Sequence, residues 1–108
     1  MHIKIELLIG DSKRQSVMAT QEANRLVQRG SVALIGPGSS EPTIQVSKLL
    51  SKPSVNRTLI GYSATSPALS RQQEYSNFLR TPPSTSVAAR LTATLMRGAI
   101  AIFGAICN

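Results

Sequence analysis

The stretch that decides the fold is residues 35–70, which read IGPGSSEPTIQVSKLLSKPSVNRTLIGYSATSPALS. An apolar strand end leads into a Gly-Pro-Gly turn, two serines and a helical pattern, and the apolar run 58–62 leads into a second hydroxyl cluster. A Gly-rich turn between a strand and a helix leaves backbone N–H groups free at the helix start, where they and the helix dipole favour an anion. Neighbouring parallel strands end at the same edge of a sheet, and ligands bind along that edge. We therefore expect two hydroxyl-bearing loops to meet there.

On the N-terminal side of this stretch, the pattern predicts two strands and a helix. Residues 3–9 alternate between apolar and polar side chains near their start, as in a half-buried strand, and residues 31–35 form a short apolar run typical of a central parallel strand. Between them we expect a helix over residues 12–29, with Ser12 opening a capping box and Gly30 following the last turn.

The C-terminal side continues the alternation of strands and helices. We expect helices over residues 41–51 and 84–97, with a short helical turn over residues 66–70. We expect strands over residues 58–62, 77–81 and 99–106. Val87, Leu91 and Leu95 share one face of the last helix. The predicted fold is α/β, an open, mainly parallel sheet with helices on both faces and right-handed crossovers.

Composition narrows the class of protein. A length of 108 residues suits one small domain, and 42% hydrophobic against 16% charged residues indicates a globular chain rather than a disordered one. A net charge of +7 favours an anionic partner. However, the lysines and arginines are scattered along the chain without an aromatic stacking pattern, so we expect no nucleic-acid partner.

Groups for catalysis or metal binding are sparse. The five carboxylates form no pair on obviously facing elements, and His2, the single histidine, lies at the N-terminus with no metal-ligand partner at the right spacing. Asp11 is interpreted as a turn and cap residue rather than a catalytic one. Cys107 is the single cysteine, so no internal disulfide is possible. We expect neither an enzyme nor a metal or cofactor site.

Four segments carry a resemblance to a known family: IGPGSS, IQVSKLL, IGYSATSPALS and FLRTPPS. They resemble the first lobe of the ligand-binding domains of class C G-protein-coupled receptors, in particular the metabotropic glutamate and GABA-B receptors. The wider superfamily has the type I periplasmic-binding-protein fold and includes natriuretic-peptide receptors and bacterial amino-acid-binding proteins. The resemblance covers residues 3–97, a partial lobe 1, and leaves residues 98–108 as an atypical or truncated tail.

The resemblance implies a ligand site. In the receptors, the second serine after the Gly-Pro-Gly turn and the hydroxyl residue of the second cluster hold the ligand's α-carboxylate, and these positions match Ser40 and Thr65. Ser63 and Ala64 match the backbone contacts beside the second position, and Ser39 matches the serine that shapes the turn. Without the resemblance, the same residues are better read as helix caps and turn residues.

One departure concerns charge. Glu41 follows Ser40 where the glutamate receptors usually have another small hydroxyl residue. Its carboxylate suits a helix start but repels an anionic ligand. In the loop beyond this helix, Asn56 begins an Asn-Arg-Thr triplet, a candidate N-glycosylation site.

The resemblance also implies a parent protein. That parent would be extracellular and membrane-anchored, and would bind a small amino-acid-like ligand of the glutamate or GABA type. It would signal by clamshell closure and dimer rearrangement, reaching a G protein through a membrane domain. No signal peptide or transmembrane span is visible in this sequence, so we expect a fragment, a truncated gene product or a partial isoform. Two alternatives stay open, a soluble substrate-binding protein of a transporter and a receptor guanylate cyclase ectodomain.

Overall fold

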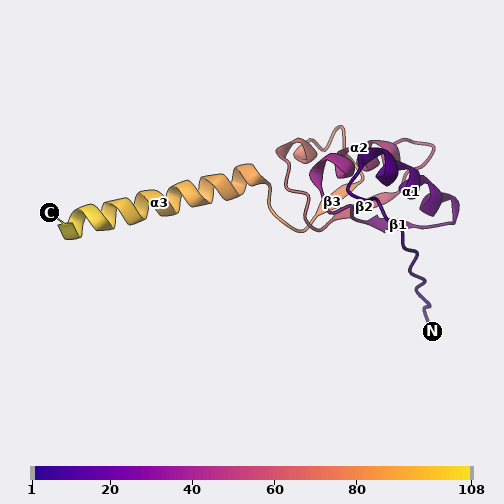
Figure 1. The fold of residues 1–108 in the computed structure, drawn as a ribbon, viewed down its shortest axis with the longest axis horizontal. Coiled ribbons are helices and arrows are strands. Elements are labelled where there is room, and N and C mark those ends of the chain that lie inside the picture. The colour runs from indigo at the N-terminus through magenta and orange to yellow at the C-terminus, as the bar shows by residue number, and fades with distance from the viewer. Residues whose placement is uncertain (1, 108) are drawn as a thin grey trace.

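The computed structural model describes residues 2–107, with the side chains of all of these except residues 103 and 105–107. Its elements follow the order α1 (Ser16–Gln28), β1 (Ala33–Ile35), α2 (Ser40–Leu50), β2 (Thr58–Gly61), the 3-10 helix η1 (Pro67–Ser70), β3 (Phe78–Arg80) and α3 (Thr85–Cys107) (Figure 1). The strands form one parallel sheet in the order β1-β2-β3. The predicted α/β class with an open parallel sheet is therefore confirmed.

The core lies between one face of the sheet and the helices α1 and α2. Leu34, Leu59 and Phe78 stand side by side in the parallel register, one from each strand, and all three are buried. The other buried apolar side chains in the described residues are Ala19, Ala23, Val46, Leu50, Ala64, Leu69 and Tyr75. The two alanines lie four residues apart on one face of α1, where their small side chains allow α1 to pack closely against α2.

The opposite face of the sheet is open. Ile35, Ile60 and Leu79 form the next row of the same register; Ile35 is 72% exposed and Leu79 is 61% exposed. We expected helices on both faces, but α1 and α2 lie together on the Leu34–Leu59 face, and α3 extends away from the sheet (Figure 1).

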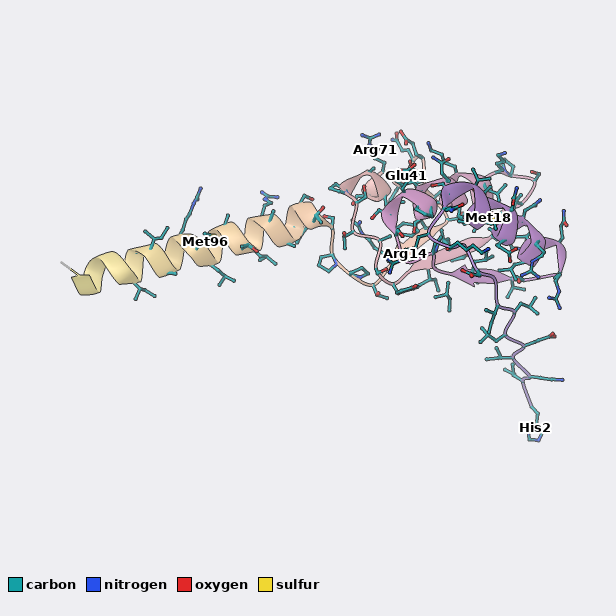
Figure 2. All side chains as sticks on the ribbon, viewed as in Figure 1. His2, Arg14, Met18, Glu41, Arg71 and Met96 are labelled. Atoms are coloured by element: carbon teal, nitrogen blue, oxygen red, sulfur yellow. The ribbon has the colours of Figure 1, made fainter. Side chains whose placement is uncertain are left out.

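The strand predicted over residues 3–9 does not form, and the segment runs away from the sheet toward His2 (Figure 2). Ile3, Ile5, Leu7 and Ile9 are more than three-quarters exposed, Leu8 is half-buried, and Arg25 Nη2 donates to the Ile9 carbonyl at 3.1 Å. The prediction was wrong because alternation specifies which way side chains point, whereas a strand also needs a hydrogen-bonded neighbour. As a consequence, β1 is an edge strand and not the predicted central one.

Helix α1 begins later than predicted but ends as predicted. Its first residue is Ser16, and no side chain caps it, so the capping box at Ser12 is absent. Lys13 has φ of +48°, outside the helical region, and its N–H donates to Asp11 Oδ1 at 2.9 Å in a turn. At the other end, Gly30 adopts φ of +92°, the left-handed conformation that closes a helix.

Helix α3 is longer than predicted. It runs through Gly98, so the predicted stop there and the predicted strand over residues 99–106 are both wrong. A single interior glycine costs about 1 kcal/mol relative to alanine, which does not outweigh a flanking run of good helix formers. Within residues 2–107, no strand lies beside residues 99–106 to draw them into the sheet. The predicted boundary after residue 97 lies inside α3, and residue 108 lies outside the described part.

The helix α3 packs against no other element. Over residues 85–102 its side chains are exposed, and Met96, with 59% of its surface exposed, points away from the helix into the open (Figure 2). Within residues 2–107, no helix combines the length and the apolar character that crossing a membrane requires.

Candidate functional site

Two loops meet at the carboxyl edge of the sheet, as the sequence predicts. The first loop (residues 36–39) follows β1, and the second loop (residues 62–66) follows β2. Because β1 and β2 are parallel and adjacent, both chains leave the sheet on the same side. Ser63 Oγ donates to the Gly38 carbonyl at 2.6 Å, which joins the loops directly.

Ser40 forms the second link between the loops. It is the first residue of α2, and its Oγ accepts hydrogen bonds from the backbone N–H groups of Thr65, at 3.2 Å, and Ser66, at 3.3 Å. Two successive N–H groups that point at one oxygen form a small anion-binding concavity. Since Ser40 Oγ uses its lone pairs here, its hydroxyl proton is free to donate to a further acceptor.

The remaining predicted site residues lie around this link. Ser39 is the N-cap of α2, but its side chain makes no cap bond; within the described residues, neither its hydroxyl nor that of Thr65 has a hydrogen-bond partner. Both residues are half-buried. Ala64 is fully buried in the core, so its side chain anchors the second loop and only its backbone can face a ligand. The structure thus brings all five predicted residues to one edge.

Glycine suits the first loop for two reasons, the positive φ of Gly36 and the close approach of Tyr62 to Gly38. Gly36 has φ of +104°, and its N–H donates to the Ile60 carbonyl at 3.0 Å, which extends the β1–β2 pairing by one residue. A Cβ atom on Gly38 would stand 3.0 Å from Tyr62 Oη. The Gly-Pro-Gly turn therefore lets the Tyr62 ring approach the backbone of the first loop.

Sequence reasoning missed two residues that hold these loops in place. Thr43 is fully buried on α2, and its hydroxyl lies 2.7 Å from the Ser39 carbonyl and 3.2 Å from the Pro37 carbonyl. Arg80, at the end of β3, donates from its guanidinium to the Ser66 carbonyl at 2.9 Å and also to Ser70 Oγ. The sequence pattern that could have identified Arg80 is a positively charged residue at the end of an apolar strand.

The site carries charge of both signs. Arg80 is half-buried and brings a permanent cation against the second loop, while the exposed carboxylate of Glu41 lies at the second residue of α2. Glu41 Oε1 accepts a hydrogen bond from Gln45 Nε2 at 3.4 Å, on the next turn of the helix. Away from this edge, the hydrogen bonds and charge of Glu22 raise the pKa of Arg25 above its ordinary value.

The candidate site is an open rim rather than a closed pocket. Gly36 and Pro37 line a cavity of about 80 Å³ that continues toward Gly10 and α1. Small-molecule pockets are typically about 300–1,000 Å³, so this cavity is too small for an amino acid. A ligand at the two loops would therefore touch this chain on one side only.

Two further predictions fall outside the rim. Asn56 is exposed, as the predicted glycosylation requires, and its Oδ1 accepts a hydrogen bond from Asn77 Nδ2 at 2.9 Å. Glycosylation itself stays a prediction. Among the described residues, no three side chains of His, Cys, Asp or Glu gather as a metal site would require.

Comparison with families of known proteins supplies an independent line of evidence. Residues 2–99 match a family described as the receptor family ligand binding region. Comparison with curated proteins gave no significant match. The matched region contains the whole parallel sheet, both loops and all five predicted site residues. The chain therefore belongs to the receptor family ligand binding region, with a partial periplasmic-binding-protein-like α/β fold.

Proposed function

We propose that this chain forms one half of a binding site for an amino-acid-like ligand in the extracellular part of a receptor. The observation that carries the proposal is the link between the two loops, where Ser40 Oγ accepts from the N–H groups of Thr65 and Ser66. The two N–H groups hold Ser40 Oγ in position, and the three serine or threonine hydroxyls that thereby gather at one sheet edge suit an α-carboxylate better than they suit catalysis. We accordingly propose a binding role and no enzymatic one.

The carboxylate would use donors that the protein does not need elsewhere. The hydroxyl protons of Ser40, Thr65 and Ser39 are available, and so is the N–H group of Glu41 in the first turn of α2. Pro42 has no N–H group, and the Thr43 N–H donates to the Ser39 carbonyl. A hydrogen bond to a charged group contributes about 1.5–3 kcal/mol, so two or three of them hold the carboxylate. The ligand's ammonium group would donate to backbone carbonyls of the second loop.

We expect the half-site to bind weakly. A second lobe normally closes over the ligand in this architecture, and the Glu41 carboxylate opposes an anion. Millimolar affinity corresponds to about −4 kcal/mol, which leaves room for few contacts beyond the carboxylate. The finer assignment, a class C G-protein-coupled receptor for glutamate or GABA with a dimeric, membrane-anchored parent, rests on the resemblance of the four sequence segments.

The direct test is an NMR titration of the ¹⁵N-labelled chain with L-glutamate and with GABA at millimolar concentration. We expect the amide signals of Thr65, Ser66 and Glu41 to shift. An equal concentration of butylamine, which has the ammonium group but no carboxylate, should leave them in place. Unchanged amide signals at both loops in a well-dispersed spectrum would contradict the proposed site.

Matched variants separate loss of binding from loss of fold. Thr65→Val removes the hydroxyl and keeps the volume, and we expect it to weaken glutamate binding about tenfold, since one charge-assisted hydrogen bond is lost. Thr92→Val, the same change on the exposed surface of α3, should leave the titration unchanged. Equal effects of the two variants would show that Thr65 does not contact the ligand.

A further inference from the structure

Glu41 is the acidic residue beside the proposed ligand site, and its charge is not compensated by a cation. It directly follows Ser40 in α2, and its side chain is exposed. The carboxylates of Glu22 and Glu74 lie 2.6 Å and 3.7 Å from an arginine, whereas none of the described cations forms an ion pair with Glu41. Its hydrogen-bond partner is the Gln45 amide, at 3.4 Å, which brings no charge. A negative charge therefore stands open at the rim.

The basic residues of the neighbouring elements are directed elsewhere or lie farther away. The guanidinium of Arg80 is bonded to the Ser66 carbonyl at 2.9 Å and to Ser70 Oγ. Lys48, in the last turn of α2, lies about 10 Å from Glu41 along the helix axis. The net charge of +7 is spread over the chain, and exposed charges more than about 8 Å apart are largely screened at physiological ionic strength. Glu41 therefore outweighs the basic surface at this edge.

A ligand held by Ser40 lies close enough to Glu41 to be affected by this charge. The Cα atoms of neighbouring residues are about 3.8 Å apart, well inside the screening distance of about 8 Å. A ligand carboxylate bound to Ser40 therefore places two negative charges side by side. The start of α2 offers only about half a positive charge through its dipole, which does not offset both. A cation on the ligand would remove the excess charge, and a second carboxylate would increase it.

We infer that the rim prefers α-amino acids with a positively charged side chain, and that Glu41 is the residue that determines this preference. The inference rests on the proposed function, because it takes the α-carboxylate to be held by Ser40 and Thr65. An exposed pair of charges changes an affinity by about threefold. We therefore expect a cationic amino acid to bind about threefold more tightly than a neutral one, and a dicarboxylate to bind about threefold more weakly.

The test compares three amino acids that share a six-carbon chain and differ in the charge at its end. L-lysine ends in an ammonium group, L-norleucine in a methyl group and L-2-aminoadipate in a carboxylate. Each is titrated into the ¹⁵N-labelled full chain at constant ionic strength, and the dissociation constant is taken from the amide shifts of Thr65 and Ser66. We expect the constant to rise about threefold from lysine to norleucine and again to 2-aminoadipate. High salt should shrink these differences, because it screens exposed charges.

A matched pair of variants separates the charge at the rim from the charge of the whole chain. Glu41→Gln and Glu6→Gln each remove one exposed carboxylate, but Glu6 lies in the segment that runs away from the sheet. We expect Glu41→Gln to abolish the order of the three ligands and Glu6→Gln to preserve it.

The outcomes distinguish the preference from the half-site itself. Equal dissociation constants for the three ligands, or an unchanged order in Glu41→Gln, would overturn the inference and leave the proposed half-site in place. A well-dispersed spectrum in which none of the three ligands shifts Thr65 or Ser66 would overturn the half-site, and the inference with it.

Discussion

Single side chains join segments that lie far apart in the sequence and thereby set the shape of the rim. Ser40 links the start of α2 to the second loop, 25 residues away, through two backbone N–H groups. Arg80 supports the same loop from β3 through the Ser66 carbonyl. The contribution of such a residue to stability depends on how many backbone groups it hydrogen-bonds, because each unpaired buried group costs about 1–3 kcal/mol.

A matched pair of arginine variants tests this view. Arg80→Met keeps most of the side-chain volume but loses the hydrogen bonds to Ser66 and Ser70, and we expect it to lower the free energy of unfolding by about 1–2 kcal/mol. Arg71→Met removes only a surface contact with Glu74 at 3.7 Å and should change the free energy of unfolding by less than about 0.5 kcal/mol. Urea unfolding followed by circular dichroism measures both. Equal losses would mean that Arg80 does not support the second loop.

At the scale of elements, local signals and tertiary contacts contribute differently. Helix α2 has both: a cap residue and proline at its start, and a buried stripe that contains Val46 and Leu50. The helix α3 has only local signals, since its side chains are exposed over residues 85–102. We therefore expect α3 to be the least stable element and the one most sensitive to helix propensity.

The glycine inside α3 provides the test. Nothing lies within 4 Å of a Cβ atom added at Gly98, so Gly98→Ala changes only the backbone preference. We expect about 0.5–1 kcal/mol of extra helix stability, seen as increased helical circular dichroism and slower amide exchange in the turns around residue 98. Gly30→Ala should instead lower the stability of its helix, because Gly30 has φ of +92°. No gain of helicity from Gly98→Ala would show that α3 is not helical at this point in solution.

At the scale of the whole molecule, the core is small. A three-stranded sheet covered on one face buries few large side chains, so we expect a low free energy of unfolding. Ligand or a second lobe would each stabilise the chain, because each binds only the folded form.

A substitution in the core tests this expectation. Leu50 is fully buried between α2 and the sheet, and Leu50→Ala should cost about 2–5 kcal/mol, enough to abolish the cooperative unfolding transition. Leu79→Ala, on the open face where this side chain is 61% exposed, should cost far less. A scan of near-ultraviolet circular dichroism against urea distinguishes the two. A cooperative transition retained by Leu50→Ala would contradict the proposed core.

The sequence by itself determined the local elements and the position of the rim. Gly30 ends α1, the apolar runs form β2 and β3, and the two loops leave parallel strands at one edge, because turn chemistry, side-chain periodicity and parallel pairing act over short distances. Only the tertiary structure decided whether residues 3–9 pair, in which direction α3 leaves the sheet, and which side chains bridge the loops. Those outcomes depend on partners distant in the sequence: a strand needs a neighbour, the start of α3 is bonded to the Thr65 carbonyl, and Arg80 reaches a carbonyl on another loop.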